Sequence, residues 1–284
     1  MNPAGSLSPI MRREPLSLRQ LLAADRALVM GILNVTPDSF SDGGRFFDPQ
    51  QALAQAKRMT SEGADIIDIG AESTRPYGGP TAVSLEEELA RLTPVLPAAV
   101  ALGRPVSIDT IKARVASWAI EAGACIVNDV WGLQRDPDMA RVVAEHGVPV
   151  IIMHNREKAD GSIDIVSDVI AFFHRSLDIA ARAGIVCEQI VLDPGIGFGK
   201  TPEQSIAVIA RLPEFKNFGL PLLVGLSRKR FINTIVPSDP GQRLGGSIAG
   251  HLLAVLHGAA IVRTHDVADT VQALRVAEAI RSAR

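Results

Sequence analysis

The 284-residue sequence predicts a single-domain (β/α)8 TIM barrel. Two observations support this fold class: eight short apolar segments recur along the chain, and amphipathic helical segments separate them. Each apolar segment has about the length of a strand and is apolar on both faces, as expected for parallel strands covered by helices. Eight alternating units favour a closed barrel over an open, doubly wound sheet, which is the structural alternative.

The predicted strands begin after a short N-terminal lead-in, residues 1–27, so we assign residues 28–284 to the barrel. The eight predicted strands are residues 28–33, 64–69, 105–108, 124–127, 148–153, 189–192, 221–226 and 259–262. No linker or low-complexity tract interrupts them. A chain of this length is ordinary for one barrel and does not require a second domain.

The helices between these strands are marked by their ends. Asp48, which precedes a proline, predicts the N-terminus of the first helix, and Gly63 predicts its end. Ser84 predicts the start of the next helix, which Pro94 and Pro97 should bend or shorten. Helical segments therefore fall where a barrel requires them.

The second half of the chain has the same pattern. Apolar residues at helical spacing within 166–177 predict a helix that ends before Gly184. Thr201 with Gln204 predicts a capping box at the start of the helix that follows the sixth strand. The alternation of strand and helix thus continues through the whole predicted barrel.

The composition argues against several classes of partner. The formal net charge is −2 and aromatic residues make up 4% of the chain, so we expect no surface for nucleic acid. No apolar run reaches the roughly 20 residues that span a bilayer, and the N-terminus lacks the apolar core of a secretory signal. Cys125 and Cys187 are too few for a disulfide framework. We therefore expect a soluble cytoplasmic protein that binds neither membrane nor nucleic acid.

Polar residues are concentrated where the predicted strands end. In a (β/α)8 barrel, catalytic groups come from the carboxyl ends of the strands and from the loops that follow them. In strand order, the polar residues there are Asn34, Glu72, Thr74, Arg75, Asp109, Asn128, Asp129, His154, Asp193, Ser227, Arg228, Lys229, Arg263 and His265. A lone strand-end Asp often caps the following helix, but so full a series predicts an active site at this end.

One part of this series suits a flat heterocycle. Asp109, Asn128, Asp193 and Lys229 supply carboxylates, an amide and an ammonium group. A heterocycle with adjacent N–H donors and a carbonyl acceptor needs such partners, because an unpaired buried polar group costs about 1–3 kcal/mol.

The other part suits an anion. Arg75, Arg263 and His265 are cationic or can become so, and the segment 41–44 is rich in glycine. A guanidinium group matches the geometry of phosphate oxygens in a bidentate manner. A neutral heterocycle with an anionic tail is therefore the substrate shape that the sequence predicts.

Three further features of the sequence need interpretation. Lys229 could be the Schiff-base lysine of an aldolase, or it could belong to a solvated basic turn. The glycine-rich segment 192–201 is not a P-loop, because Pro194 stands where the first glycine of that motif is required. Asp38 and Asp42 could support a magnesium ion that is held through the phosphates of a substrate.

Seven segments at successive strand ends together resemble the dihydropteroate synthase family of folate biosynthesis. They are MGILNVTPDSFSDGG (30–44), GADIIDIGAESTRP (63–76), SIDT (107–110), NDV (128–130), LDPGIGFGKT (192–201), GLSRKRF (225–231) and RTHDV (263–267). The resemblance extends over residues 29–279 and implies a pterin-binding (β/α)8 barrel. Seven segments in the same order are far more specific than any one of them.

The resemblance implies a transferase and assigns roles to particular residues. The family joins a pterin that carries a methylene diphosphate to the amine of para-aminobenzoate, and diphosphate leaves before the amine attacks. The pterin-binding residues would be Asp109, Asn128, Asp193 and Lys229. The diphosphate-binding residues would be Asn34, Arg75, Arg263 and His265. The residues around para-aminobenzoate would be Phe40, Thr74, Pro76, Phe198 and Ser227. The catalytic residues would be Asn34, Asp38, Arg75, Lys229, Arg263 and His265.

The resemblance also implies a cofactor and an assembly. Mg²⁺ would be the cofactor, with Asn34 as its contact in the protein. The substrates would be small molecules, and we expect a homodimer with the small-residue-rich segment 245–260 as the candidate interface.

The chain departs from the usual family pattern in two places. The loop between Pro76 and Val83 is about two residues longer, and residues 154–164 read HNREKADGSID in place of a Met-rich, Pro-containing stretch. For that reason we do not assign His154 and Asn155 to the ligand site. Two other functions are consistent with a pterin pocket: methyl transfer, as in the barrel modules of methyltetrahydrofolate methyltransferases, and pterin binding without catalysis.

Overall fold

The computed structural model describes residues 18–23, 26–36, 48–72 and 83–283. Its eight parallel strands form a closed barrel in which each strand pairs with the next and β8 pairs with β1. They are β1 (Leu28–Asn34), β2 (Ile66–Gly70), β3 (Val106–Asp109), β4 (Ile126–Asp129), β5 (Val150–Met153), β6 (Ile190–Asp193), β7 (Leu222–Gly225) and β8 (Ala259–Thr264). The prediction of a (β/α)8 TIM barrel is confirmed.

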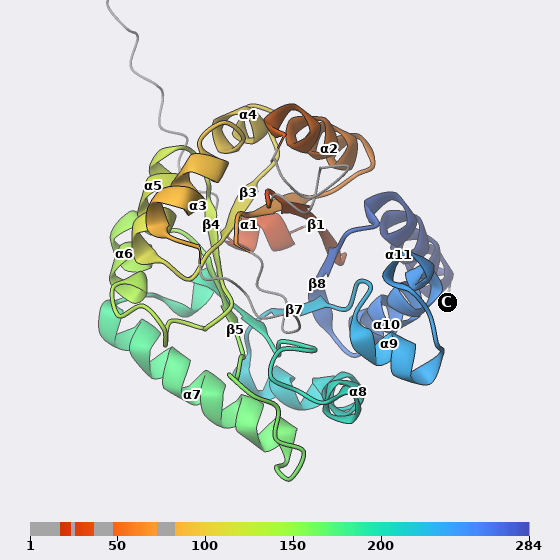
Figure 1. Cartoon of the computed structure of the whole chain (residues 1–284). Coiled ribbons are helices and arrows are strands. Elements are labelled where there is room, and N and C mark those ends of the chain that lie inside the picture. Colours follow the sequence, from red (N-terminus) through yellow and green to blue (C-terminus); the bar gives the residue numbers. More distant parts are fainter. Residues whose placement is uncertain (1–17, 24–25, 37–47, 73–82, 284) are drawn as a thin grey trace, which may run out of the picture.

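Helices surround the barrel, as Figure 1 shows along its axis. The described α-helices are α1 (Leu18–Leu22), α2 (Pro49–Ser61), α3 (Leu85–Leu92), α4 (Leu96–Val100), α5 (Ala113–Glu121), α6 (Met139–His146), α7 (Ile165–Ala183), α8 (Pro202–Ala210), α9 (Arg230–Ile235), α10 (Leu244–Leu256) and α11 (Val267–Ser282). Among the described residues, no helix is both long and apolar enough to cross a membrane.

The predicted helix ends are found in the structure. The Asp48 carboxylate accepts a hydrogen bond from the backbone N–H of Gln50 at the start of α2. Pro94 lies in the break between α3 and α4, and Pro97 lies in the first turn of α4, so the predicted shortening is confirmed. Thr201 and Gln204 form the predicted capping box of α8, and α7 ends at Gly184 in the left-handed conformation.

Several strands begin one or two residues later than predicted. The backbone N–H groups of Ala64 and Ala124, which were placed in strands, bond back to Met59 and Ala119 of the preceding helices. An N–H group that completes a helix end cannot also join the sheet, so β2 and β4 start after these turns. Apolar character alone does not mark that boundary.

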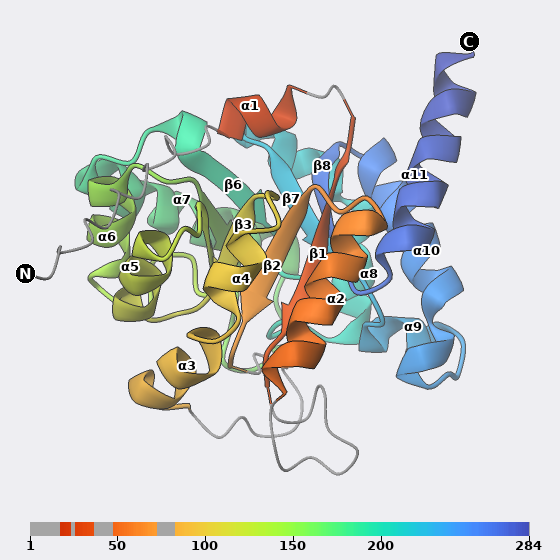
Figure 2. The same cartoon turned by 90° about the horizontal axis from the view of Figure 1, so that it is seen from above.

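The lower half of the barrel interior is an apolar layer. Its members are Leu28, Met30, Ile66, Ile126, Ile151, Val191, Leu223 and Ile261. Leu21 and Leu22 of α1 pack against this layer, and Figure 2 shows α1 across the corresponding end of the barrel. On the outside of the sheet, Val29 and Val262 pack with Val271 of α11. The strands are therefore buried on both faces, as their sequences predicted.

Candidate active site

The interior changes from apolar to polar one step along the strands. Side chains alternate along a strand, so a residue two positions beyond an interior residue also faces the interior. Two positions beyond Ile66, Ile126, Val191 and Ile261 stand Asp68, Asn128, Asp193 and Arg263. The polar side chains thus form a second layer directly above the apolar one, at the carboxyl ends of the strands.

Arg263 connects two carboxylates in this polar layer. Its Nε donates to Asp68 Oδ2 at 2.6 Å, and its Nη2 donates to Asp109 Oδ2 at 2.7 Å. Asn128 Nδ2 donates to the same Asp68 oxygen at 3.1 Å. Four strands, β2, β3, β4 and β8, are therefore joined by one guanidinium group and one amide. Arg263, which the sequence grouped with the anion site, is placed here beside the heterocycle set.

Two carboxylate oxygens in this cluster lack a hydrogen bond. Asp68 Oδ1 and Asp109 Oδ1 are buried and have no partner within the part of the chain that the structure describes. Burial raises the pKa of Asp109 to about 7, although the nearby Arg263 opposes this shift. A buried acceptor without a partner costs free energy, and a ligand with N–H groups would remove that cost. This is the arrangement that a flat, donor-rich heterocycle needs.

Asp193 and Lys229 lie on the β6 and β7 side of the barrel. Burial raises the pKa of Asp193, whose Oδ1 accepts from the backbone N–H of Gly195 at 2.7 Å. Burial lowers the pKa of Lys229 to about 8, opposed by the charge of Asp193. The Lys229 ammonium group donates to the carbonyl of Ile196 and lies 4.7 Å from the centre of the Phe198 ring. The loop after β6 therefore positions both an aromatic ring and a cation.

Ser227 and His265 connect the ends of β7 and β8. The Ser227 hydroxyl accepts from the backbone N–H of His265 at 3.1 Å and lies 3.0 Å from its Nδ1. Arg228, between Ser227 and Lys229, has a positive φ of 58° and pairs with Asp266. The turn that carries Ser227 and Lys229 is consequently fixed against the end of β8.

The predicted site residues divide into those that the structure describes and those that it does not. Asn34 is the last residue of β1, so it lies at the same end of the barrel as Asp109. Asp38, Phe40, Thr74, Arg75 and Pro76 lie outside the described residues, as do Asp42 and the segment 41–44. The described residues of the pterin set lie at the carboxyl end of the barrel. Arg263 bonds to Asp109, Phe198 lies against Lys229, and Ser227 contacts His265.

Two of the strand-end residues serve the scaffold. The Asp129 carboxylate accepts from the backbone N–H groups of Trp131 and Leu133, which is the capping role expected of some strand-end acids. Glu72 pairs with Lys112 and accepts from the backbone N–H of Val83 at 3.4 Å. These contacts fix loops around the site rather than offer groups to a ligand.

Asp68 is a site residue that the sequence analysis missed. It is fully buried in the middle of an apolar strand, whereas the predicted site residues all lie at or after strand ends. The alternation of β2 could have revealed it, because Asp68 follows the interior Ile66 by two positions. A fully buried carboxylate in an apolar run is a signal that requires a cationic partner.

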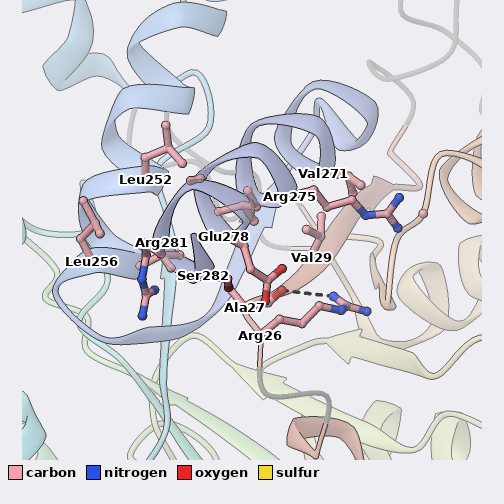
Figure 3. A pocket seen from close by; sticks show the side chains of 14 residues that line it. Arg26, Ala27, Val29, Leu252, Leu256, Val271, Arg275, Glu278, Arg281 and Ser282 are labelled. Atoms are coloured by element: carbon pink, nitrogen blue, oxygen red, sulfur yellow. Dashed lines mark hydrogen bonds between the residues drawn. The ribbon is translucent and has the colours of Figure 1, made fainter. Parts of the chain in front are cut away.

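A cavity of about 380 Å³ lies away from the carboxyl ends of the strands. It is formed between α10, α11 and the start of β1, and Leu252, Val271 and Arg275 are among its lining residues (Figure 3). It contains none of the predicted site residues. We therefore place the chemistry in the barrel mouth and not in this cavity.

The donor set for a metal ion is sparse. Among the described residues, no group of three or more His, Cys, Asp or Glu side chains could hold a metal. Asn34 offers a carboxamide oxygen at the barrel mouth. Mg²⁺ commonly binds through one or two protein ligands together with substrate phosphates and water, and the residues present fit that mode.

Comparison with known proteins agrees with this geometry. Residues 30–265 match the pterin binding enzyme family. The dihydropteroate synthase of Bacillus subtilis is 46% identical over 257 residues, which cover 90% of this chain and 89% of that protein.

Two solved structures are also similar. The dihydropteroate synthase of Xanthomonas albilineans in complex with 7,8-dihydropteroate has a TM-score of 0.84 at 42% identity, covering 94% of this chain and 96% of that one. The dihydropteroate synthase of Yersinia pestis, solved with a sulfonamide drug, has a TM-score of 0.84 at 43% identity, covering 92% and 96%. The chain, with its closed barrel and its acidic, arginine-linked mouth, belongs to the dihydropteroate synthase family.

Proposed function

We propose that the mouth of this barrel carries out the reaction of its family. In that reaction, 6-hydroxymethyl-7,8-dihydropterin diphosphate and para-aminobenzoate give 7,8-dihydropteroate and diphosphate. The observation that carries the proposal is the Asp68–Arg263–Asp109 cluster, with its buried and unpaired carboxylate oxygens. Family membership favours this condensation over the aldolase and methyl-transfer alternatives.

The pterin ring would lie against the polar layer. Asp109 and Asp193 would accept from the N–H groups of the ring, and Asn128 and Lys229 would donate to its acceptors. These four side chains come from four strands or strand-following turns, so the scaffold holds them without the ligand. The raised pKa of Asp109, about 7, also allows this group to donate when it is protonated.

The diphosphate would be bound by Asn34, Arg75, Arg263 and His265. The contacts of Arg263 with Asp68 and Asp109 hold its guanidinium group at the boundary of the pterin and diphosphate sites. A donor fixed in advance stabilises charge that develops on a leaving group, typically by about 3 kcal/mol. Asn34 would hold Mg²⁺ together with phosphate oxygens and water. When it is bound, this ion would neutralise part of the charge on the departing diphosphate.

Para-aminobenzoate would occupy the surroundings of Phe40, Thr74, Pro76, Phe198 and Ser227. Phe198 and Ser227 are the described members of this set, and the Lys229 ammonium group lies above the Phe198 ring. Because the Yersinia pestis relative was solved with a sulfonamide drug, we expect a sulfonamide to compete with para-aminobenzoate here.

The order of bond changes would be dissociative. The C–O bond to diphosphate breaks first, and the amine of para-aminobenzoate then forms the C–N bond and loses a proton. Asp38 would stabilise the positive charge on the methylene carbon. An aromatic amine is nucleophilic at neutral pH, so the site does not need a strong base.

The test is a turnover assay with pterin diphosphate, Mg²⁺ and para-aminobenzoate, in which diphosphate release is measured. We expect release that depends on para-aminobenzoate and falls by about 10²-fold or more in Asn34→Ala. Arg141→Met, on the exposed surface of α6, is the matched control and should keep full activity. Binding of the pterin without any turnover would instead identify a non-catalytic relative.

We further propose that the protein acts in the cytoplasm as a homodimer. Leu253 and Leu256 of α10, within the segment 245–260, and Val276 and Ile280 of α11 are large apolar side chains that are exposed in the single chain. A second copy of the chain would cover such a surface. Light scattering should give twice the mass of one chain, and Leu253→Asp should reduce it to that of a monomer.

A further inference from the structure

Lys200 is a buried cation to which the reaction assigns no role. It follows the glycine-rich loop 195–199 after β6 and is only 2% exposed. Its motif is not a P-loop, because Pro194 stands where the first glycine of that motif is required. A lysine is almost never fully buried unless it is paired, so its partners indicate its purpose.

The Lys200 ammonium group donates three hydrogen bonds, one for each of its N–H groups. The acceptors are the carbonyl of Gly195 at 2.8 Å, the carbonyl of Phe198 at 3.1 Å and His154 Nδ1 at 2.6 Å. Burial lowers the pKa of His154 to about 3, so this ring is neutral and can accept at Nδ1. Burial also lowers the pKa of Lys200, but three acceptors around one nitrogen match the charged form.

His154 is held in turn from α7. Its Nε2 lies 3.0 Å from Asp168 Oδ2, which also pairs with Arg156 at 2.8 Å. The carboxylate fixes the tautomer with a proton on Nε2, and this leaves Nδ1 free to accept from Lys200.

The loop 195–199 rests directly on the loop after β5. A Cβ atom at Gly195 would lie 1.9 Å from the carbonyl oxygen of His154, and one at Gly199 would lie 2.4 Å from the Cβ of Arg156. Both glycines have positive φ angles, 64° and 53°. The close packing restricts the position of the loop, and the hydrogen bonds of Lys200 to two loop carbonyls hold it there.

This loop contacts two groups of the site. Its Gly195 N–H donates to Asp193, and its Ile196 carbonyl accepts from Lys229. Its Phe198 ring lies beneath the Lys229 ammonium group at 4.7 Å. A shift of the loop would move the ring and the acceptor of Lys229 together.

We propose that Lys200 and His154 are positioning residues for this active site, which hold the loop 195–199 so that Phe198 meets para-aminobenzoate in a fixed geometry. The inference rests on the proposed function, because that function places Phe198 beside para-aminobenzoate. Lys200 and His154 touch neither substrate and act only through the loop.

The first test is Lys200→Met, which keeps the length of the side chain and removes the donors. The KM for para-aminobenzoate should rise about tenfold or more, because two loop carbonyls lose their partner and the loop relaxes. The affinity for pterin diphosphate, measured by calorimetry, should fall by a smaller factor than the KM rises, because two of the four pterin residues, Asp109 and Asn128, stand on β3 and β4 and not beside the loop. Met59→Ala, a buried change in α2 far from the loop, is the control for lost stability alone.

The second test uses a pair of His154 variants in case Lys200→Met does not fold. His154→Asn keeps an acceptor at the position of Nδ1, whereas His154→Leu does not. His154→Asn should restore most of the KM for para-aminobenzoate that His154→Leu loses.

Two outcomes overturn the inference alone. In one, Lys200→Met changes the KM for both substrates by the same factor. That result would be expected if the variant only lowered the stability of the fold, as Met59→Ala does. In the other, the Asn and Leu variants of His154 behave alike. A wild-type protein without para-aminobenzoate-dependent diphosphate release would overturn the proposed function and this inference with it.

Discussion

The two layers of side chains inside the barrel belong to the same strands but differ in polarity and in role. The lower layer, with Ile66 and Ile261 among its members, is apolar and closed by α1. The upper layer, two residues further on, contains Asp68 and Arg263 and contains buried acceptors that lack partners. The residues that stabilise the barrel and the residues proposed for the chemistry are therefore separated by only two positions, about 6–7 Å, along each strand.

The largest expected effect comes from breaking the upper layer at its cation. Arg263→Met would leave Asp68 and Asp109 buried without a counter-charge, which costs about 3–5 kcal/mol of unfolding free energy. Diphosphate release should also fall by about 10³-fold, because a donor in the site is lost. Urea denaturation and the turnover assay measure the two effects. An active and stable variant would contradict the role of the cluster.

A change in the lower layer should affect stability and spare the chemistry. Ile261→Ala, two residues before Arg263, removes buried methyl groups and should cost about 2–5 kcal/mol of unfolding free energy. At a temperature where the variant is folded, kcat/KM should remain within about threefold of wild type. A loss of activity as large as that of Arg263→Met would mean that the two layers are not separable.

Asp129 is adjacent in sequence to the site residue Asn128, but its carboxylate stabilises the turn after β4. Asp129→Ala removes the acceptor for Trp131 and Leu133 and should cost about 1–3 kcal/mol of unfolding free energy. Pterin affinity, measured by calorimetry, should be unchanged. Asn128→Ala is the paired variant and should weaken pterin binding.

Asp109 should make the stability of the protein depend on pH. Burial raises the pKa of Asp109 from 3.8 to about 7, so the folded protein keeps a proton that the unfolded chain releases. This stabilising contribution is complete below about pH 4 and is lost as the pH rises toward 7, by up to about 1.4 kcal/mol per pH unit. Asp109→Asn should flatten the unfolding free energy across that range. Equal slopes for both proteins would show that Asp109 is already ionised.

Much of the fold and part of the site could be predicted from the sequence. Apolar runs on both faces identify parallel strands, and strand ends locate Asp109, Asn128 and Asp193, because both signals are local. Asp68 was missed because it lies in the middle of a strand and not at its end, and its bond to Arg263, 195 residues away in the chain, leaves no local signal. The pairing of His154 with Lys200 escaped for the same reason, since their contact depends on how two loops stack.

The close approach of Gly195 to the carbonyl of His154 has a consequence for protein engineering. The glycine-rich loop packs directly on the segment that follows β5. This contact begins at Gly195, two residues after Asp193. A chimaera that imports one of these segments from another family member would lack a matching base for it. Both should be exchanged together if the grafted barrel is to retain its substrate pocket.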